Sequence, residues 1–281
     1  MKRTHPLNTV RALALTTSAP PARTTIGLIL VGCALMFLVL QIGTTWLTGR
    51  FDMTWSALIA TSTMLGLALL LEKLFFKRAL LPALRALGFR RPNPPALAVA
   101  GIIALIMLAF FPLFTLVTGI PVSLRSDWWW VLIGAVALNG IAEETLFRGY
   151  VFGGLRRSGL SFGRAGSISL VIFAAVHLFL FIQNPFLIAL LGTLVAIAAA
   201  FPMAYLFERG NNALWAPVVL HVAAHAIRLV DVPEPYYLTA VSAWLVLQLG
   251  APFLVLAFRR NLLNPPEAQQ TIHPPATHFG E

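Results

Sequence analysis

Long apolar runs are the feature that most constrains what this chain can fold into. Stretches of about eighteen residues or more without a formal charge recur along its 281 residues, and each could cross a bilayer as an α-helix. Only 11% of the residues are charged, against about 25% in a typical soluble domain. The sequence therefore predicts an all-α protein, a polytopic transmembrane helix bundle in a lipid bilayer, and it excludes a disordered chain.

About eight spans can be drawn, of which the fifth and seventh are short. They cover residues 26–47, 53–71, 96–117, 128–152, 167–181, 186–207, 215–230 and 236–258. We divide the chain accordingly into five parts. These are an N-terminal tail (1–25), N-terminal transmembrane helices (26–127), a central core (128–230), a last transmembrane helix (231–260) and a flexible C-terminal tail (261–281).

Basic residues predict the orientation of the spans. Most Lys and Arg residues fall in the N-terminal tail, in the segment 72–95, in the loops after the fourth and sixth spans, and just after the eighth. Because basic loops stay on the cytoplasmic side, eight spans place both termini in the cytoplasm. The net charge of +10 then reflects topology and contacts with lipid headgroups, so we expect no nucleic-acid partner.

Ionisable residues inside the membrane gather in three of the predicted spans. A charged side chain near the bilayer centre costs roughly 2.5–3.5 kcal/mol on insertion scales, so such groups should face the bundle interior or a water-filled cavity. They are Glu143, Glu144 and Arg148 in the fourth span, His177 in the fifth, and His221 and His225 in the seventh.

Spacing predicts how these residues are arranged. Glu144 and Arg148 stand at i and i+4, so they should form a structural ion pair on one helical face. Glu143 points about 100° away from Glu144, lacks a comparable local partner and is left free to meet water. Glu143, His177 and His221 each lie roughly 18–20 Å along their helices from a basic anchor. We therefore expect these three residues at a similar depth.

Two adjacent glutamates and three histidines at one depth favour a chemical site over separate structural roles. A proton-coupled transporter would also place Glu and His inside the membrane. A scaffold could use the same residues only to stabilise the bundle. These alternatives stay open on the arrangement alone.

The same residues carry a resemblance to a known family. They occur as Glu143-Glu144-Thr-Leu-Phe-Arg148, as Phe173 followed four residues later by His177, and as His221-Val-Ala-Ala-His225. These segments resemble the EExxxR, FxxxH and HxxxN or HxxxD motifs of the CPBP family. That family comprises CAAX prenyl endopeptidases and bacteriocin-processing or immunity-associated relatives, also called Abi proteins. The resemblance covers roughly residues 128–227.

This resemblance implies an intramembrane endopeptidase that hydrolyses a membrane-associated or lipidated peptide or protein through an activated water. Carried over, Glu143 is the general base and His177 its partner in positioning or protonation, while His221 and His225 donate to the carbonyl oxyanion. Position 225 departs from the family, which has Asn or Asp there. The core 128–230 would be the catalytic part, and the expected location is the bacterial plasma (inner) membrane.

A zinc-dependent version of the same protease remains an alternative. Histidines at i and i+4 can share one metal, so Glu143, His177, His221 and His225 could together bind zinc. The segment lacks, however, the Glu that follows the first His in HExxH metalloproteases. We therefore favour the glutamate mechanism without a cofactor, and keep a non-proteolytic membrane scaffold or immunity factor as the alternative from another class.

Overall fold

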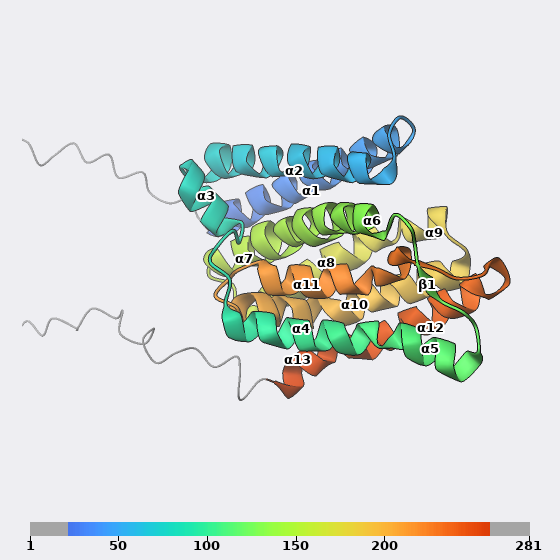
Figure 1. Cartoon of the computed structure of the whole chain (residues 1–281). Coiled ribbons are helices and arrows are strands. Elements are labelled where there is room, and N and C mark those ends of the chain that lie inside the picture. The colour runs from blue at the N-terminus through green and yellow to red at the C-terminus, as the bar shows by residue number, and fades with distance from the viewer. Residues whose placement is uncertain (1–21, 259–281) are drawn as a thin grey trace, which may run out of the picture.

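The computed structural model describes residues 22–258. It is a bundle of long helices that run roughly along one axis (Figure 1), which confirms the predicted all-α polytopic bundle. The helix α1 (Ala22–Thr48) begins inside the segment predicted as the N-terminal tail (1–25). The rest of that tail and the predicted C-terminal tail (261–281) lie outside the described residues.

The first part of the chain forms one helical hairpin and one long interrupted helix beside the core. Helices α1 and α2 (Met53–Phe76) pack together, and α2 begins where the Asp52 carboxylate accepts the backbone N–H groups of Thr54 and Trp55. The short α3 (Leu80–Ala86) leads to α4 (Pro94–Leu108), which starts with Asn93 as its N-cap. Helix α5 (Phe110–Thr118) continues α4 and ends at Gly119, whose positive φ of 71° favours glycine.

The core of the chain is a second set of helices. Helices α6 (Trp128–Ala135), η1 (Val136–Ala142), η2 (Thr145–Phe152) and α7 (Gly153–Arg157) form one continuous rod, followed by α8 (Phe162–His177), α9 (Leu180–Gln183) and α10 (Phe186–Arg209). Then come α11 (Trp215–Ala224), η3 (Ala226–Leu229), η4 (Glu234–Tyr236), α12 (Tyr237–Gly250), η5 (Ala251–Phe253) and α13 (Leu254–Ala257).

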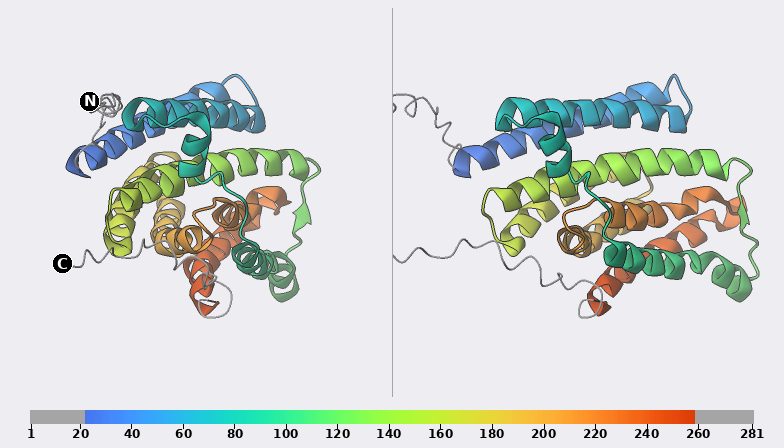
Figure 2. Two further views of the ribbon diagram at one scale, coloured as in Figure 1. Left: turned by 90° about the vertical axis from the view of Figure 1, so that its left-hand side faces the viewer. Right: turned by 60° about the vertical axis from the view of Figure 1, so that its left-hand side comes forward.

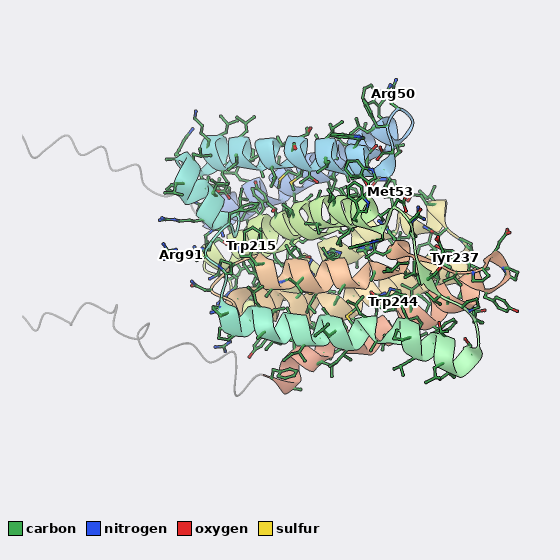
Figure 3. All side chains as sticks on the ribbon, viewed as in Figure 1. Arg50, Met53, Arg91, Trp215, Tyr237 and Trp244 are labelled. Carbon is green, nitrogen blue, oxygen red and sulfur yellow. The ribbon has the colours of Figure 1, made fainter. Side chains whose placement is uncertain are left out.

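Seven helices of the described part are long and apolar enough to cross a membrane. The seventh predicted span (215–230) differs, because α11 has ten residues and is therefore about 15 Å long. After it the chain turns through η3 into the strand β2 (Val230–Asp231), which pairs antiparallel with β1 (Ser123–Leu124). The prediction of eight full-length spanning helices was wrong at this point. Helix α11 packs against α4, α10 and η1, so it is supported inside the protein. The chain passes from the Trp215 end of the bundle to the Tyr237 end through α11 and the segments that follow it (Figure 3).

The layers place the core between two outer groups of helices. In the views of Figures 1 and 2 the α1–α2 hairpin lies on one side, α4 with α13 on the opposite side, and the α6–α7 rod with α11 between them. Large apolar side chains remain exposed, among them Leu116 (81%), Val117 (82%) and Ile182 (78%). Such exposure suits lipid and would be costly in water, so the protein is an integral membrane protein.

Labelled side chains mark the two ends of the bundle. Arg91 and Trp215 lie at one end, and Arg50, Met53 and Tyr237 lie at the other (Figure 3). At the Arg91 end the fully buried Glu72 of α2 pairs with Arg78 and lies 3.7 Å from Arg157 of α7. This cluster ties the hairpin to the end of the α6–α7 rod.

Candidate active site

The rod that carries the two adjacent glutamates is irregular on both sides of them. Segments η1 and η2 have π-helical hydrogen bonding, and Glu143 and Glu144 lie in the short α-helical stretch between them. π-Helical turns are rare and are found frequently at functional sites. The irregular segment lies against α2, α8 and α11, which brings residues from three other helices next to the carboxylates.

Glu144 is fully buried and is held by two partners. Its Oε1 atom accepts a hydrogen bond from Arg148 at 3.0 Å and lies 2.5 Å from Nδ1 of His221. The i, i+4 pair expected with Arg148 is therefore present. A carboxylate can only accept, so Nδ1 of His221 is the donor. Residue spacing could not predict this second partner, because His221 is on another helix.

Glu143 is the more accessible of the two glutamates. Its side chain is 18% exposed, whereas that of Glu144 is 0% exposed. Nε2 of His221 lies 3.7 Å from Oε2 of Glu143, which is too long for a hydrogen bond. His221 thus stands between the two carboxylates, bonded to one and facing the other. Between these two glutamates, Glu143 is the one that a water molecule can reach.

Asn139 is a site residue that sequence reasoning missed. Its Nδ2 donates to Oε1 of Glu143 at 2.8 Å, and its Oδ1 accepts from Arg228 at 3.3 Å. The expectation for Glu143 concerned a charged partner on its own helix, and the partner found there is the neutral amide of Asn139. The signal was present in the sequence, since Asn139 stands one helical turn before Glu143. Its acceptor role toward Arg228 also fixes which side of the amide faces Glu143.

His177 is oriented by its own helix. Its Nδ1 lies 2.7 Å from the backbone carbonyl of Phe173, and because a carbonyl can only accept, Nδ1 is the donor and Nε2 is left free. The ring also meets Phe173 edge to face at 4.5 Å, and the Arg148 guanidinium lies 4.7 Å from the centre of the same Phe173 ring. Phe173 therefore places both His177 and Arg148.

His225 lies beside His221 at the end of α11. The two rings are stacked with their centroids 5.3 Å apart and their planes inclined by 24°. Helix α11 ends at Ala224, so His225 is the first residue after its regular part. His225 is thus close to the glutamate-bound imidazole, but it makes no direct contact with either carboxylate among the described residues.

A cavity of about 290 Å³ opens in front of these residues. Its wall is mostly apolar and comes from α4, η2, α8, α9, α10, α11, η3, α12 and η5. The charged or titratable groups in it include Arg148, His177, His221, His225 and Arg228. Neither glutamate contributes to the wall, so His221 and Arg148 are the wall residues that contact the carboxylates.

The four candidate zinc ligands do not gather around one point. Within residues 22–258 no group of three or more His, Cys, Asp or Glu side chains has an arrangement that could hold a metal ion. The described side chains therefore do not form the set of ligands that a catalytic zinc requires, and no step is assigned to a metal.

The geometry offers the parts of a water-dependent hydrolysis. There is a reachable carboxylate, Glu143, an imidazole with a free nitrogen, His177, and a second imidazole anchored to a buried carboxylate, His221. Peptide hydrolysis without a Ser or Cys nucleophile needs a base for water, a proton donor for the leaving amine and donors for the oxyanion.

One of three comparisons with known proteins agrees with this set of groups. No curated protein and no solved structure matches the chain. Residues 125–227 match the family model described as type II CAAX prenyl endopeptidase Rce1-like. The matched region runs from just before the α6–α7 rod to η3, and it contains every motif residue discussed above. The resemblance stated from those motifs is thus confirmed over residues 125–227, the part of this membrane protein that is similar to the type II CAAX prenyl endopeptidases.

Proposed function

We propose that this protein is an intramembrane endopeptidase that cleaves a membrane-associated or lipidated peptide or protein by means of a water activated at Glu143. The observation that carries the proposal is the unequal pair of glutamates around His221. Glu144 is fully buried and tied to Arg148 and His221, while Glu143 is more accessible and accepts a hydrogen bond from Asn139. A fixed, accessible carboxylate beside an imidazole is what a general base requires.

In the proposed step, Glu143 takes a proton from a water molecule whose oxygen attacks the scissile carbonyl carbon. His221 in its imidazolium form keeps one N–H on Glu144 and directs the other toward the developing oxyanion, with His225 beside it. The proton is then delivered to the leaving amine, through Glu143 or Nε2 of His177, as the C–N bond breaks. Water is divided between the two products, and the enzyme returns to its starting state.

The location of the protein is part of the proposal. The end of the bundle that carries Arg91 and the Glu72 cluster would face the cytoplasm, since basic segments stay on that side. Both termini would then be cytoplasmic, and the membrane would be the bacterial plasma (inner) membrane.

The test is cleavage by purified protein in liposomes. The probe is a farnesylated peptide ending in a Cys-aliphatic-aliphatic-Met sequence, and the products are identified by mass spectrometry. Glu143→Gln keeps the size of the side chain and its bond to Asn139 can re-form, but an amide cannot take the proton. We expect a loss of at least about a hundredfold in cleavage rate with an unchanged melting temperature.

A matched control comes from the same substitution outside the site. Glu234 of η4 is exposed, so Glu234→Gln should cleave the probe at the wild-type rate. Full activity of Glu143→Gln would contradict the proposal and favour the scaffold alternative.

A further inference from the structure

One buried amide in the cavity wall has no role in the chemistry just described. Gln248 of α12 lines the cavity and is 3% exposed. Among residues 22–258 its side-chain carboxamide forms no hydrogen bond, yet neither of its polar atoms is fully enclosed by protein. The small surface that Gln248 keeps is therefore on the carboxamide and faces the cavity.

The inner face of α12 is fixed by a neighbour of Gln248. Trp244, one helical turn earlier, is 0% exposed, donates its indole N–H to the carbonyl of Ala224 at 3.0 Å and stacks on Phe111 at 4.9 Å. Residues four apart share a helical face, so Gln248 is held toward the bundle interior and cannot turn to the lipid.

Gln248 lines the cavity farther along the chain than Tyr237 and Trp244 do. Figure 3 places Tyr237 at the end of the bundle and Trp244 farther in along α12. Gln248 follows Tyr237 by three helical turns, or roughly 16 Å. His177, His221 and Gln248 line one continuous cavity. The carboxamide of Gln248 lies farther from the Tyr237 end of the bundle than Tyr237 itself does.

Several other polar side chains of this wall already have a partner within the protein. Arg148 bonds Glu144, His177 bonds a backbone carbonyl, and Asn184 donates to the carbonyl of Leu180. An amide left without a partner in an apolar site is unfavourable. Its partner should therefore be brought by whatever enters the cavity.

The chemistry of the carboxamide identifies that partner. A glutamine offers two N–H donors and one carbonyl acceptor, which matches the N–H and C=O that each peptide unit of an extended chain must satisfy. A hydrocarbon tail has neither group and would leave Gln248 unpaired. A peptide main chain in this apolar groove would in turn find few other partners.

We propose that Gln248 binds the main chain of the peptide substrate, so that the part of the cavity beside Gln248 receives polypeptide and not a lipid tail. The inference rests on the proposed peptidase function and adds to it which part of the substrate occupies this space. Gln248 is thereby a substrate-positioning residue, separate from the glutamates and histidines.

The test replaces Gln248 with methionine, which has a similar length and no hydrogen-bonding amide. With the farnesylated peptide in liposomes, Gln248→Met should raise KM about tenfold, equivalent to about 1.4 kcal/mol, with kcat changed less than about twofold. Without substrate, the melting temperature should stay the same or rise, because an unsatisfied polar group has been removed. Gln41→Met in α1, which does not line the cavity, is the matched control with unchanged KM.

Two binding probes separate main-chain recognition from lipid recognition. Gln248→Met should weaken binding of the farnesylated peptide about tenfold and leave binding of farnesylcysteine methyl ester unchanged. An unchanged peptide KM, an equal loss for both probes, or a lower melting temperature would each overturn the inference while leaving the peptidase intact. A wild-type protein that neither binds nor cleaves the peptide overturns the proposed function, and this inference with it.

Discussion

Arg148 gives the sharpest prediction about stability. The Arg148→Ala substitution removes the cation that neutralises Glu144, and both side chains are almost completely enclosed, at 3% and 0% exposure. Breaking a buried ion pair from one side costs about 3–5 kcal/mol. Because His221 remains as a second partner of Glu144 at 2.5 Å, we expect the lower end, about 3 kcal/mol. This corresponds to a fall of roughly 6–12 °C in melting temperature.

The assay is thermal unfolding of purified protein in detergent, in which the fraction of protein that remains monodisperse is measured against temperature. Arg156→Ala is the control, since Arg156 pairs with Glu208 at 2.6 Å but both side chains are about one-third exposed. Pairs of that kind contribute about 0–1 kcal/mol. Adding Glu144→Gln to Arg148→Ala should recover a large part of the loss, because the stranded charge is gone. A melting temperature for Arg148→Ala within about 2 °C of wild type would refute the reasoning.

Two further predictions concern the chemistry. Asn139→Leu removes the donor that orients Glu143, and a hydrogen bond to a charged group contributes about 1.5–3 kcal/mol. The cleavage rate of the peptide probe should therefore fall at least about tenfold. An unchanged rate would show that Asn139 has no part in the site. Treatment with 1,10-phenanthroline should leave cleavage unchanged and metal analysis should show no stoichiometric zinc, whereas inhibition that added zinc reverses would establish the metalloprotease alternative.

The helical framework could be predicted because lipid imposes a simple rule on sequence. Uncharged runs long enough to cross the bilayer are conspicuous, and seven of the described helices have that length. The same rule failed for 215–230, since α11 is apolar for a different reason: it is enclosed by other helices. Hydropathy does not distinguish a lipid-facing segment from one that is buried in protein.

The site could be predicted only as far as contacts within one helix. Arg148 follows Glu144 at i+4, and that pair is present. The position of His221 between Glu143 and Glu144 depends on how α11 packs against the α6–α7 rod, and periodicity within one helix carries no such information.

Asn139 and Gln248 were missed for another reason. Both are neutral and sit in apolar runs, so a search for ionisable groups passes over them. Asn139 becomes significant once its bond to Glu143 is seen, and Gln248 because its carboxamide has no protein partner in the described part of the chain. Both can be recognised as site residues only from the hydrogen-bond partners that they have or lack in the described fold.

The most direct test of the account is to profile protein termini in membranes from cells that express either the wild type or Glu143→Gln at matched levels. The account predicts new N- and C-terminal peptides, from membrane-associated proteins, that appear with the wild type and disappear with Glu143→Gln. Identical termini in the two samples, together with a cellular phenotype that Glu143→Gln leaves intact, would contradict a peptidase and identify these residues as parts of a scaffold.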